Sequence, residues 1–404
     1  MRVSRQAFIP KPMQSAMPIA KPSLCILASL MLLTAGMTSA NAQSNVTVYG
    51  RVNAGVVNYS GYSQNRPSVT RMNNLASRIG FKGSEDLGQG LAATFMIETG
   101  FSPDTGDGTL ASREASVGLE GGFGKVRFGY MLSALDDLHS IAGPGYATNV
   151  TNDNQNGFWA NGASNLFTGG TVGSTACKQV AGPDGNTNSF AFDNRIGNSI
   201  RYDSPTMNNF RIATQYALGE GGAGNCSGSY AWSNKIQYQD KQLVAALAWE
   251  QHHAVRGLGL NDQILMLAAG YQFTPNHYLG GWWQTIRYAN PGLGDLRQQA
   301  WGAIYKYQMN AQLFEIAWYR AGAGSGAQTP VFSGIFVGPD TAANLYILGY
   351  RYKFSKRTEL WAQWAQLRNG NKSGYDLGGA GKAGAAGTLA SSPRALAFGV
   401  KHDF

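Results

Sequence analysis

Charge, proline, cysteine and long hydrophobic runs are all scarce in this sequence. Charged residues make up 14% of the 404, whereas roughly a quarter is usual in soluble proteins. No run of about 18 apolar residues follows residue 42, which excludes membrane-spanning helices there. The 14 prolines exclude Pro-rich disorder, and 19 Tyr, 18 Phe and 9 Trp need burial or lipid contact. Two classes remain: a large soluble β protein, or a membrane barrel whose apolar surface is hidden by alternation.

Residues 1–42 have the pattern of an export signal. A basic start is followed by an apolar run over 24–37 and by Ala40-Asn41-Ala42, a small-x-small cleavage signature. The apolar run is too short to cross a membrane as an anchor. We expect residues 1–42 to be removed and residues 43–404 to form a single domain.

The three cysteines carry a separate prediction. Cys25 lies in the expected signal, so Cys177 and Cys226 remain, each in a stretch rich in Gly and polar residues. Exported proteins meet oxidising conditions, which favours one disulfide between two surface loops, with two unrelated thiols as the alternative. The five histidines show no metal-ligand spacing, so we expect neither a metal nor a cofactor.

From Val46 onward the dominant pattern has period two, which places apolar and polar side chains on opposite faces of strands. Phe95 and Ile97 alternate with Met96 and Glu98, for example. Sixteen such runs are separated by connections that alternate between short and long. They lie near 46–58, 75–85, 91–101, 112–121, 124–131, 194–204, 209–218, 229–239, 241–252, 262–274, 276–288, 297–308, 310–321, 343–354, 357–368 and 394–404.

This alternation of short turns and long loops is typical of outer-membrane barrels. Backbone groups in hydrocarbon have no water to bond, so the sheet must close on itself. Tyr and Trp near the strand ends, such as Tyr130 and Trp361, fit the aromatic girdles at the two membrane interfaces. The prediction is an all-β, 16-stranded antiparallel transmembrane β-barrel. A soluble sandwich would tolerate the same alternation and remains the alternative.

Five segments in order carry a family likeness: 44–51 (SNVTVYGR), 77–90 (SRIGFKGSEDLGQG), 113–121 (REASVGLEG), 198–205 (NSIRYDSP) and the terminal Phe404. With the signal, they resemble Gram-negative general porins of the beta-proteobacterial type, along the whole mature chain. The resemblance implies a homotrimer in the outer membrane, in contact with lipid and lipopolysaccharide, with a third long loop folded into each barrel. It also implies that barrel assembly machinery reads the strand ending in Phe404, and that small hydrophilic solutes diffuse through the pore.

The charges on the expected channel-facing parity are mostly basic. If apolar positions face lipid, the opposite parity lines the channel with twelve basic residues: Arg51, Arg78, Lys82, Lys125, Arg127, Arg195, Arg201, Arg211, Lys235, Lys306, Arg351 and Lys353. Four acidic residues share that parity: Glu98, Asp203, Glu315 and Asp403. Like charges in a narrow pore raise the local concentration of the opposite ion, which predicts a preference for anions. The alternative is that many of these charges lie at the mouths, where salt screens them.

The third long loop, roughly 132–193, supplies the expected constriction. By the family resemblance, Asp136 and Asp137 in this loop face basic wall residues, here Arg78 and Arg113. Strict alternation turns Arg113 toward lipid, so its channel role requires a bulge near Gly118. We expect the second half of the loop, which contains Cys177, to cap the mouth.

Other function classes find little support in the sequence. No Gly-x-Ser-x-Gly elbow is present, and the glycine motifs at 219–224 and 379–384 open no helix, so we expect no enzyme. The basic residues are spread along the strands instead of forming a patch, which argues against nucleic-acid binding. Two alternatives stay open: a substrate-specific channel for organic acids or sugars, and a plugged structural or adhesive barrel.

Overall fold

The computed structural model describes residues 45–62, 68–143, 192, 195–219, 228–255, 259–327, 335–375, 377 and 389–404. The chain divides into two compact units, Met1–Ala42 and Gln43–Phe404, and every described strand belongs to the second unit. No helix in the described part of the chain is long and apolar enough to cross a membrane.

Nearly all the regular structure of the second unit is antiparallel sheet. Its strands are β1 (Asn45–Ser60), β2 (Val69–Asn74), β3 (Arg78–Gly88), β4 (Leu91–Gly100), β5 (Glu114–Gly121), β6 (Gly124–Leu132), β7 (Arg195–Asp203), β8 (Phe210–Leu218), β9 (Tyr230–Gln239), β10 (Leu243–His253), β11 (Asn261–Thr274), β12 (His277–Tyr288), β13 (Leu296–Met309), β14 (Gln312–Ala321), β15 (Ala343–Lys353), β16 (Thr358–Asn369) and β17 (Arg394–Asp403). Between β6 and β7 lie the 3-10 turn η2 (Asp136–Leu138) and the short helix α2 (His139–Ala142).

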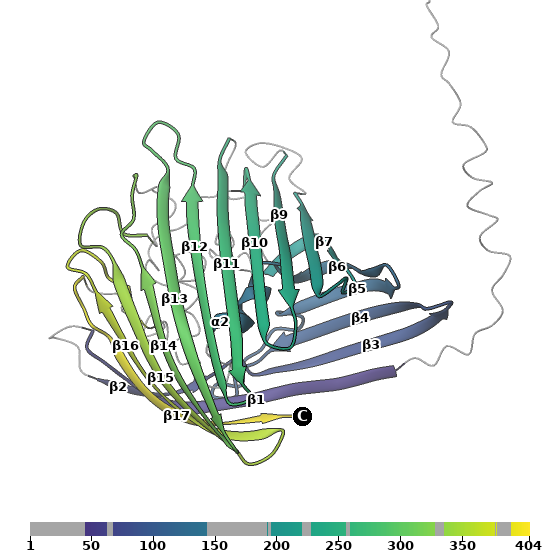
Figure 1. The fold of residues 1–404 in the computed structure, drawn as a ribbon, viewed down its shortest axis with the longest axis horizontal. Coiled ribbons are helices and arrows are strands. Elements are labelled where there is room, and N and C mark those ends of the chain that lie inside the picture. Colours follow the sequence, from purple (N-terminus) through teal and green to yellow (C-terminus); the bar gives the residue numbers. More distant parts are fainter. Residues whose placement is uncertain are drawn as a thin grey trace, which may run out of the picture. The chain divides into compact units, whose positions relative to one another are not determined.

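The strands close into a barrel in chain order (Figure 1). The first and last strands meet, because β1 pairs with β17 from Arg51↔Asp403 to Ser60↔Arg394. On its other side β1 pairs with β2 along one half and with β3 along the other, so β2 and β3 are two parts of one transmembrane strand. The predicted 16-stranded barrel is therefore confirmed. The second transmembrane strand begins at Val69, earlier than the predicted residue 75. Its first part, β2, was missed because the period-two alternation is interrupted between β2 and β3.

The break between β2 and β3 decides which side chains point inward. Residues 75–77 lie opposite only Val52 and Asn53 of β1, so one extra residue is inserted, as in a β-bulge. Asn53 holds the break by donating from Nδ2 to the Leu75 carbonyl at 2.9 Å, and Ala76 adopts a positive φ of 61°. The insertion reverses the parity of the strand, which brings Arg78 onto the inner face.

The outward face of the barrel is apolar, as the alternation predicts. Val46, Phe81, Phe95, Val117 and Phe128 are all exposed large hydrophobic side chains. Buried polar side chains occupy the opposite parity: Asn53, Glu98, Gln215, Glu250 and Gln284. This distribution is the reverse of that in a soluble sheet protein, and it fits a wall with lipid outside and polar groups inside.

One sector of the inner face departs from this pattern. On β11 to β15 the inward positions include Ile264, Met266, Trp282, Ile304 and Leu345, none of which is more than 5% exposed. The short helix α2 contacts β11, β12 and β13 over this sector. The inner wall is therefore apolar where this loop segment packs against β11 to β13.

Candidate channel lining

The start of the third long loop lies inside the barrel, on the inner wall. Tyr319 of β14 donates to the Ala142 carbonyl at 3.0 Å, and Lys306 of β13 donates to the Gly143 carbonyl at 2.9 Å. At Gly280 a Cβ would lie 2.5 Å from the Ile141 carbonyl oxygen, so glycine there admits the loop. The predicted inward fold holds for residues 133–143, and residues 144–191 lie outside the described part of the chain.

Three ionic networks of described residues line the inner wall. The first, the Glu98 network, consists of Arg78, Glu98 and Arg113. Glu98 Oε1 accepts from Arg113 Nε at 2.6 Å, and its Oε2 lies 3.6 Å from Arg78 Nε. The hydroxyl of Tyr49 donates to the same carboxylate at 3.0 Å. Lys82 Nζ lies 5.2 Å from the centre of the Tyr49 ring, and no described carboxylate is within ion-pair distance of it.

Arg113 reaches the inner face by a route that differs from the predicted one. The pairing of β4 with β5 runs through Thr94↔Gly118 without a shift, so there is no bulge at Gly118. Instead, β5 begins only at Glu114, and Arg113 lies just before it, after a residue with positive φ at Ala111. Strand alternation fixes the direction of side chains only within the strand, so Arg113 can reach Glu98 from a position before β5, and the predicted bulge near Gly118 is wrong.

The second network, the Asp137 network, links the loop to the wall through Glu114, Arg127, Asp203, Arg201, Asp137 and Lys235. Asp137 Oδ2 lies 2.7 Å from Arg201 Nη2 and 2.6 Å from Lys235 Nζ. Arg201 also contacts Asp203 at 2.7 Å, and Arg127 contacts Asp203 at 2.9 Å. The direct partners of Asp137 are thus Arg201 and Lys235, not Arg78 and Arg113.

The third network, the Glu359 network, follows the wall from β13 to β1 through Lys306, Glu315, Arg351, Glu359, Lys401, Asp403 and Arg51. Glu359 Oε1 lies 3.2 Å from Lys401 Nζ and 3.9 Å from Arg351 Nη1. Arg351 contacts Glu315 at 2.9 Å, and Lys401 contacts Asp403 at 3.0 Å. Arg51, predicted to line the channel, ends the network by pairing with Asp403 at 2.7 Å.

Two further predicted channel residues, Arg195 and Asp136, lie near the Glu98 network. Arg195, at the start of β7, donates from Nε to the Arg113 carbonyl and interacts electrostatically with Asp136. Asp136 lies 3.7 Å from His139 Nδ1 within the same loop. Arg195 therefore lies between the Arg113 backbone and one loop carboxylate, whereas the expected partners of Asp136 were Arg78 and Arg113.

The inner face carries more acidic side chains than the four that the sequence predicted. Glu114, Glu250, Asp262 and Glu359 are also on it, and all but Glu114 are 4% exposed or less. Glu114 and Glu359 could have been read from the sequence, because Val117 and Leu360 fix the outward parity of their strands. The excess of basic residues is therefore smaller than twelve to four.

The remaining predicted sites concern the chain end and the cysteines. Phe404 follows β17 and exchanges backbone hydrogen bonds with Gly50 at 3.0 and 3.1 Å. A Cβ at Gly50 would clash with the Phe404 ring, so the glycine makes room for it. Cys177 and Cys226 lie outside the described residues.

Comparisons with known proteins agree with this fold. The family model for "Gram-negative porin" matches residues 27–372. The chain is 28% identical to Major outer membrane protein P.IB of Neisseria meningitidis serogroup B over 369 residues, covering 87% of this chain and 98% of the relative. It is 28% identical to Outer membrane porin protein 32 of Delftia acidovorans over 400 residues, covering 95% and 100%.

Solved structures share the architecture. The anion-selective porin from Comamonas acidovorans superposes with a TM-score of 0.66 at 22% identity, covering 90% of this chain and 100% of the other. The trimer form of OmpT from Vibrio cholerae gives 0.58 at 13% identity, covering 89% and 99%. The match of the family model over most of the chain shows that this protein belongs to the family of Gram-negative porins, outer-membrane β-barrels that let small hydrophilic solutes diffuse passively.

Proposed function

We propose that this porin prefers anions. The observation that carries the proposal is that the three networks together hold nine cationic residues and seven carboxylates, so the lining keeps an excess of positive charge. Two cations share one carboxylate in the Glu98 network. The Asp137 network has three charges of each sign, and the Glu359 network has four cations and three carboxylates. A permeating ion therefore meets a lining with net positive charge in a low-dielectric wall, which attracts anions and repels cations. The description of the Comamonas acidovorans relative as anion-selective supports the same reading.

The functional form is a homotrimer, with residues 1–42 removed on export. The trimer form of the OmpT structure supports the assembly, and the signal pattern of the sequence supports the export. The place of Phe404, at the closing seam of the barrel, suits a signal read by barrel assembly machinery. The apolar outer face suits contact with outer-membrane lipid and lipopolysaccharide. The protein acts as a channel and not as an enzyme, in keeping with its family.

Reversal potential tests the preference directly. Purified protein in a planar bilayer should give conductance steps, and a KCl gradient should give a reversal potential of the sign that reports Cl⁻ over K⁺. R78Q and R113Q should each shift the reversal potential toward K⁺, because each removes a cation beside Glu98. A wild-type potential that reports K⁺ over Cl⁻ would refute the preference.

The variant R297Q is a matched control that distinguishes the effect of charges in the channel lining from that of charges at the rim. Arg297, near the start of β13, is 61% exposed and pairs with Asp295 just before the strand, so R297Q removes the same charge where salt screens it. We expect its reversal potential to equal that of the wild type. An equal shift in R297Q and R113Q would mean that overall charge, not the lining, sets the selectivity. Current block by low concentrations of one solute would favour the substrate-specific alternative.

A further inference from the structure

A second group of cations surrounds a pocket at the end of the barrel that carries the short turns. The turn between β15 and β16 supplies Lys353, Ser355, Lys356, Arg357 and Thr358. The pocket, here called the mouth pocket, has a volume of about 560 Å³ and is completed by Ala311, Arg351, Glu359 and Lys401. In outer-membrane barrels the short turns face the periplasm. The mouth pocket therefore belongs to the periplasmic mouth of the channel.

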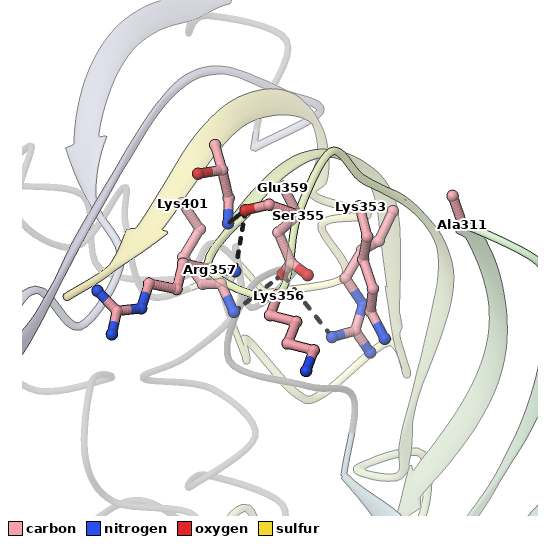
Figure 2. A pocket seen from close by; sticks show the side chains of 9 residues that line it. Ala311, Lys353, Ser355, Lys356, Arg357, Glu359 and Lys401 are labelled. Atoms are coloured by element: carbon pink, nitrogen blue, oxygen red, sulfur yellow. Dashed lines mark hydrogen bonds and ion pairs between the residues drawn. The ribbon is translucent and has the colours of Figure 1, made fainter.

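The cations of this pocket fall into two kinds. Arg351 and Lys401 at its back are paired with Glu359, and Figure 2 shows Lys401 and Glu359 joined by a dashed line. Lys353, Lys356 and Arg357 at its front have no described carboxylate within ion-pair distance. These three positive charges line one pocket without a described counter-charge, and a monovalent ion offsets only one of them. The pocket is therefore suited to an anion that carries several charges.

The backbone fixes the turn that presents these cations. Ser355 Oγ accepts from the backbone N–H groups of Arg357 and Thr358 at 3.1 and 3.0 Å. The Phe354 N–H donates to the Thr358 carbonyl at 3.0 Å, and the Lys353 N–H donates to the Ala311 carbonyl at 2.8 Å. The charged groups thus extend from a turn that is already ordered, which lowers the entropic cost of binding.

We propose that the mouth pocket binds a small soluble oxyanion with several negative charges, of the inorganic diphosphate class. Arginine and lysine form short charge-assisted hydrogen bonds with phosphate oxygens, and an arginine fork can bind two of them at once. Arg351 and Lys401 lie on the inner face of the barrel, so the pocket opens toward the channel and not toward lipid. The site concentrates such anions at the periplasmic mouth, where it adjoins the Glu359 network through Arg351 and Lys401.

Calorimetric titration of the detergent-solubilised porin with sodium diphosphate tests the site. At matched ionic strength, diphosphate should bind more tightly than phosphate, and chloride should not compete. The triple variant K353Q/K356Q/R357Q should raise the Kd about 30-fold, from about threefold for each exposed cation lost. Its side chains lie at the surface of the turn, so folding should persist, and the heat-resistant β-sheet circular dichroism signal checks this.

Lys241 offers the matched control, because it lies exposed in the short turn between β9 and β10. K241Q should change the Kd by less than about twofold, whereas R357Q should raise it about threefold. Equal losses in K241Q and R357Q, or wild-type affinity in the triple variant, would overturn the site. Binding does not depend on conduction, so diphosphate binding by a protein without conductance steps would refute the channel and keep the site.

Discussion

Cationic side chains cluster both in the middle of the barrel and at its periplasmic mouth. In the middle they are paired with carboxylates, whereas at the front of the mouth pocket they have no described carboxylate partner. In the middle, Arg78 and Arg113 share Glu98, and Arg201 shares Asp137 with Lys235. At the mouth, the front of the pocket presents cations without described carboxylates. Paired cations stabilise the wall and leave a moderate positive potential that acts on permeating ions. Unpaired cations can bind an anion and retain it. The placement of carboxylates, more than the number of cations, separates conduction from binding.

Removing the shared carboxylate of the middle is expected to have the largest effect. E98Q leaves Arg78 and Arg113 close together with no countercharge between them, so stability should fall by about 2–3 kcal/mol. The reversal potential should shift further toward Cl⁻, because the cations lose their compensation. Urea unfolding followed by tryptophan fluorescence measures the first effect, and planar bilayers measure the second. In the control E120Q, whose carboxylate is 54% exposed, stability should change by less than about 0.5 kcal/mol.

The second largest effect is expected from removing the ion pairs that hold the loop against the barrel wall. D137N removes the carboxylate that joins Arg201 to Lys235, and stability should fall by about 1–2 kcal/mol, since Asp137 is partly exposed. D136N makes the same change at the neighbouring residue, whose contact with His139 is longer, and should cost less than about 0.5 kcal/mol. Equal losses of stability in the two variants would mean that Asp137 does not anchor the loop.

A carboxylate introduced into the mouth pocket should give its cations a counter-charge, as the cations in the middle of the barrel already have. A311E introduces one beside Lys353, and diphosphate affinity should fall about tenfold through charge repulsion and pairing. A311Q has nearly the same shape without the charge and should keep most of the affinity. If the two variants bind diphosphate equally well, size and not charge governs the pocket.

Removing an ion pair at the rim should have the smallest effect on stability. This small loss is the baseline against which the larger effects are compared. The Arg287 side chain, followed by the Asn290 backbone N–H, holds the pKa of Asp295 below its ordinary value. The contribution of Asp295 is therefore present at neutral pH and disappears as the pH falls through its folded-state pKa. D295N should lose about 0.5 kcal/mol at pH 7, and the difference from wild type should vanish near about pH 2. Urea titrations at the two pH values check this, and a pH-independent loss would contradict it.

Much of the inner wall could be predicted from the sequence, since parity places Arg127, Arg201 and Glu98 opposite the apolar outer positions. Parity failed where a residue lies outside its strand, as with Arg113, or where both faces are apolar, as at Ile264 and Leu265. It also could not pair Asp137 with Lys235, because residues 98 apart meet only after a loop turns inward.

By itself the sequence determined the class of protein, the strand order and the outward face, because alternation with period two is a local property that lipid makes obligatory. Only the tertiary structure decided which charges meet. The closing of β1 on β17 completes the Glu359 network, and the inward loop completes the Asp137 network. The mouth pocket likewise exists only because the turn after β15 lies beside β17, so that Lys401 reaches Glu359. Electrostatic energy depends on distances in space, which strand parity does not fix.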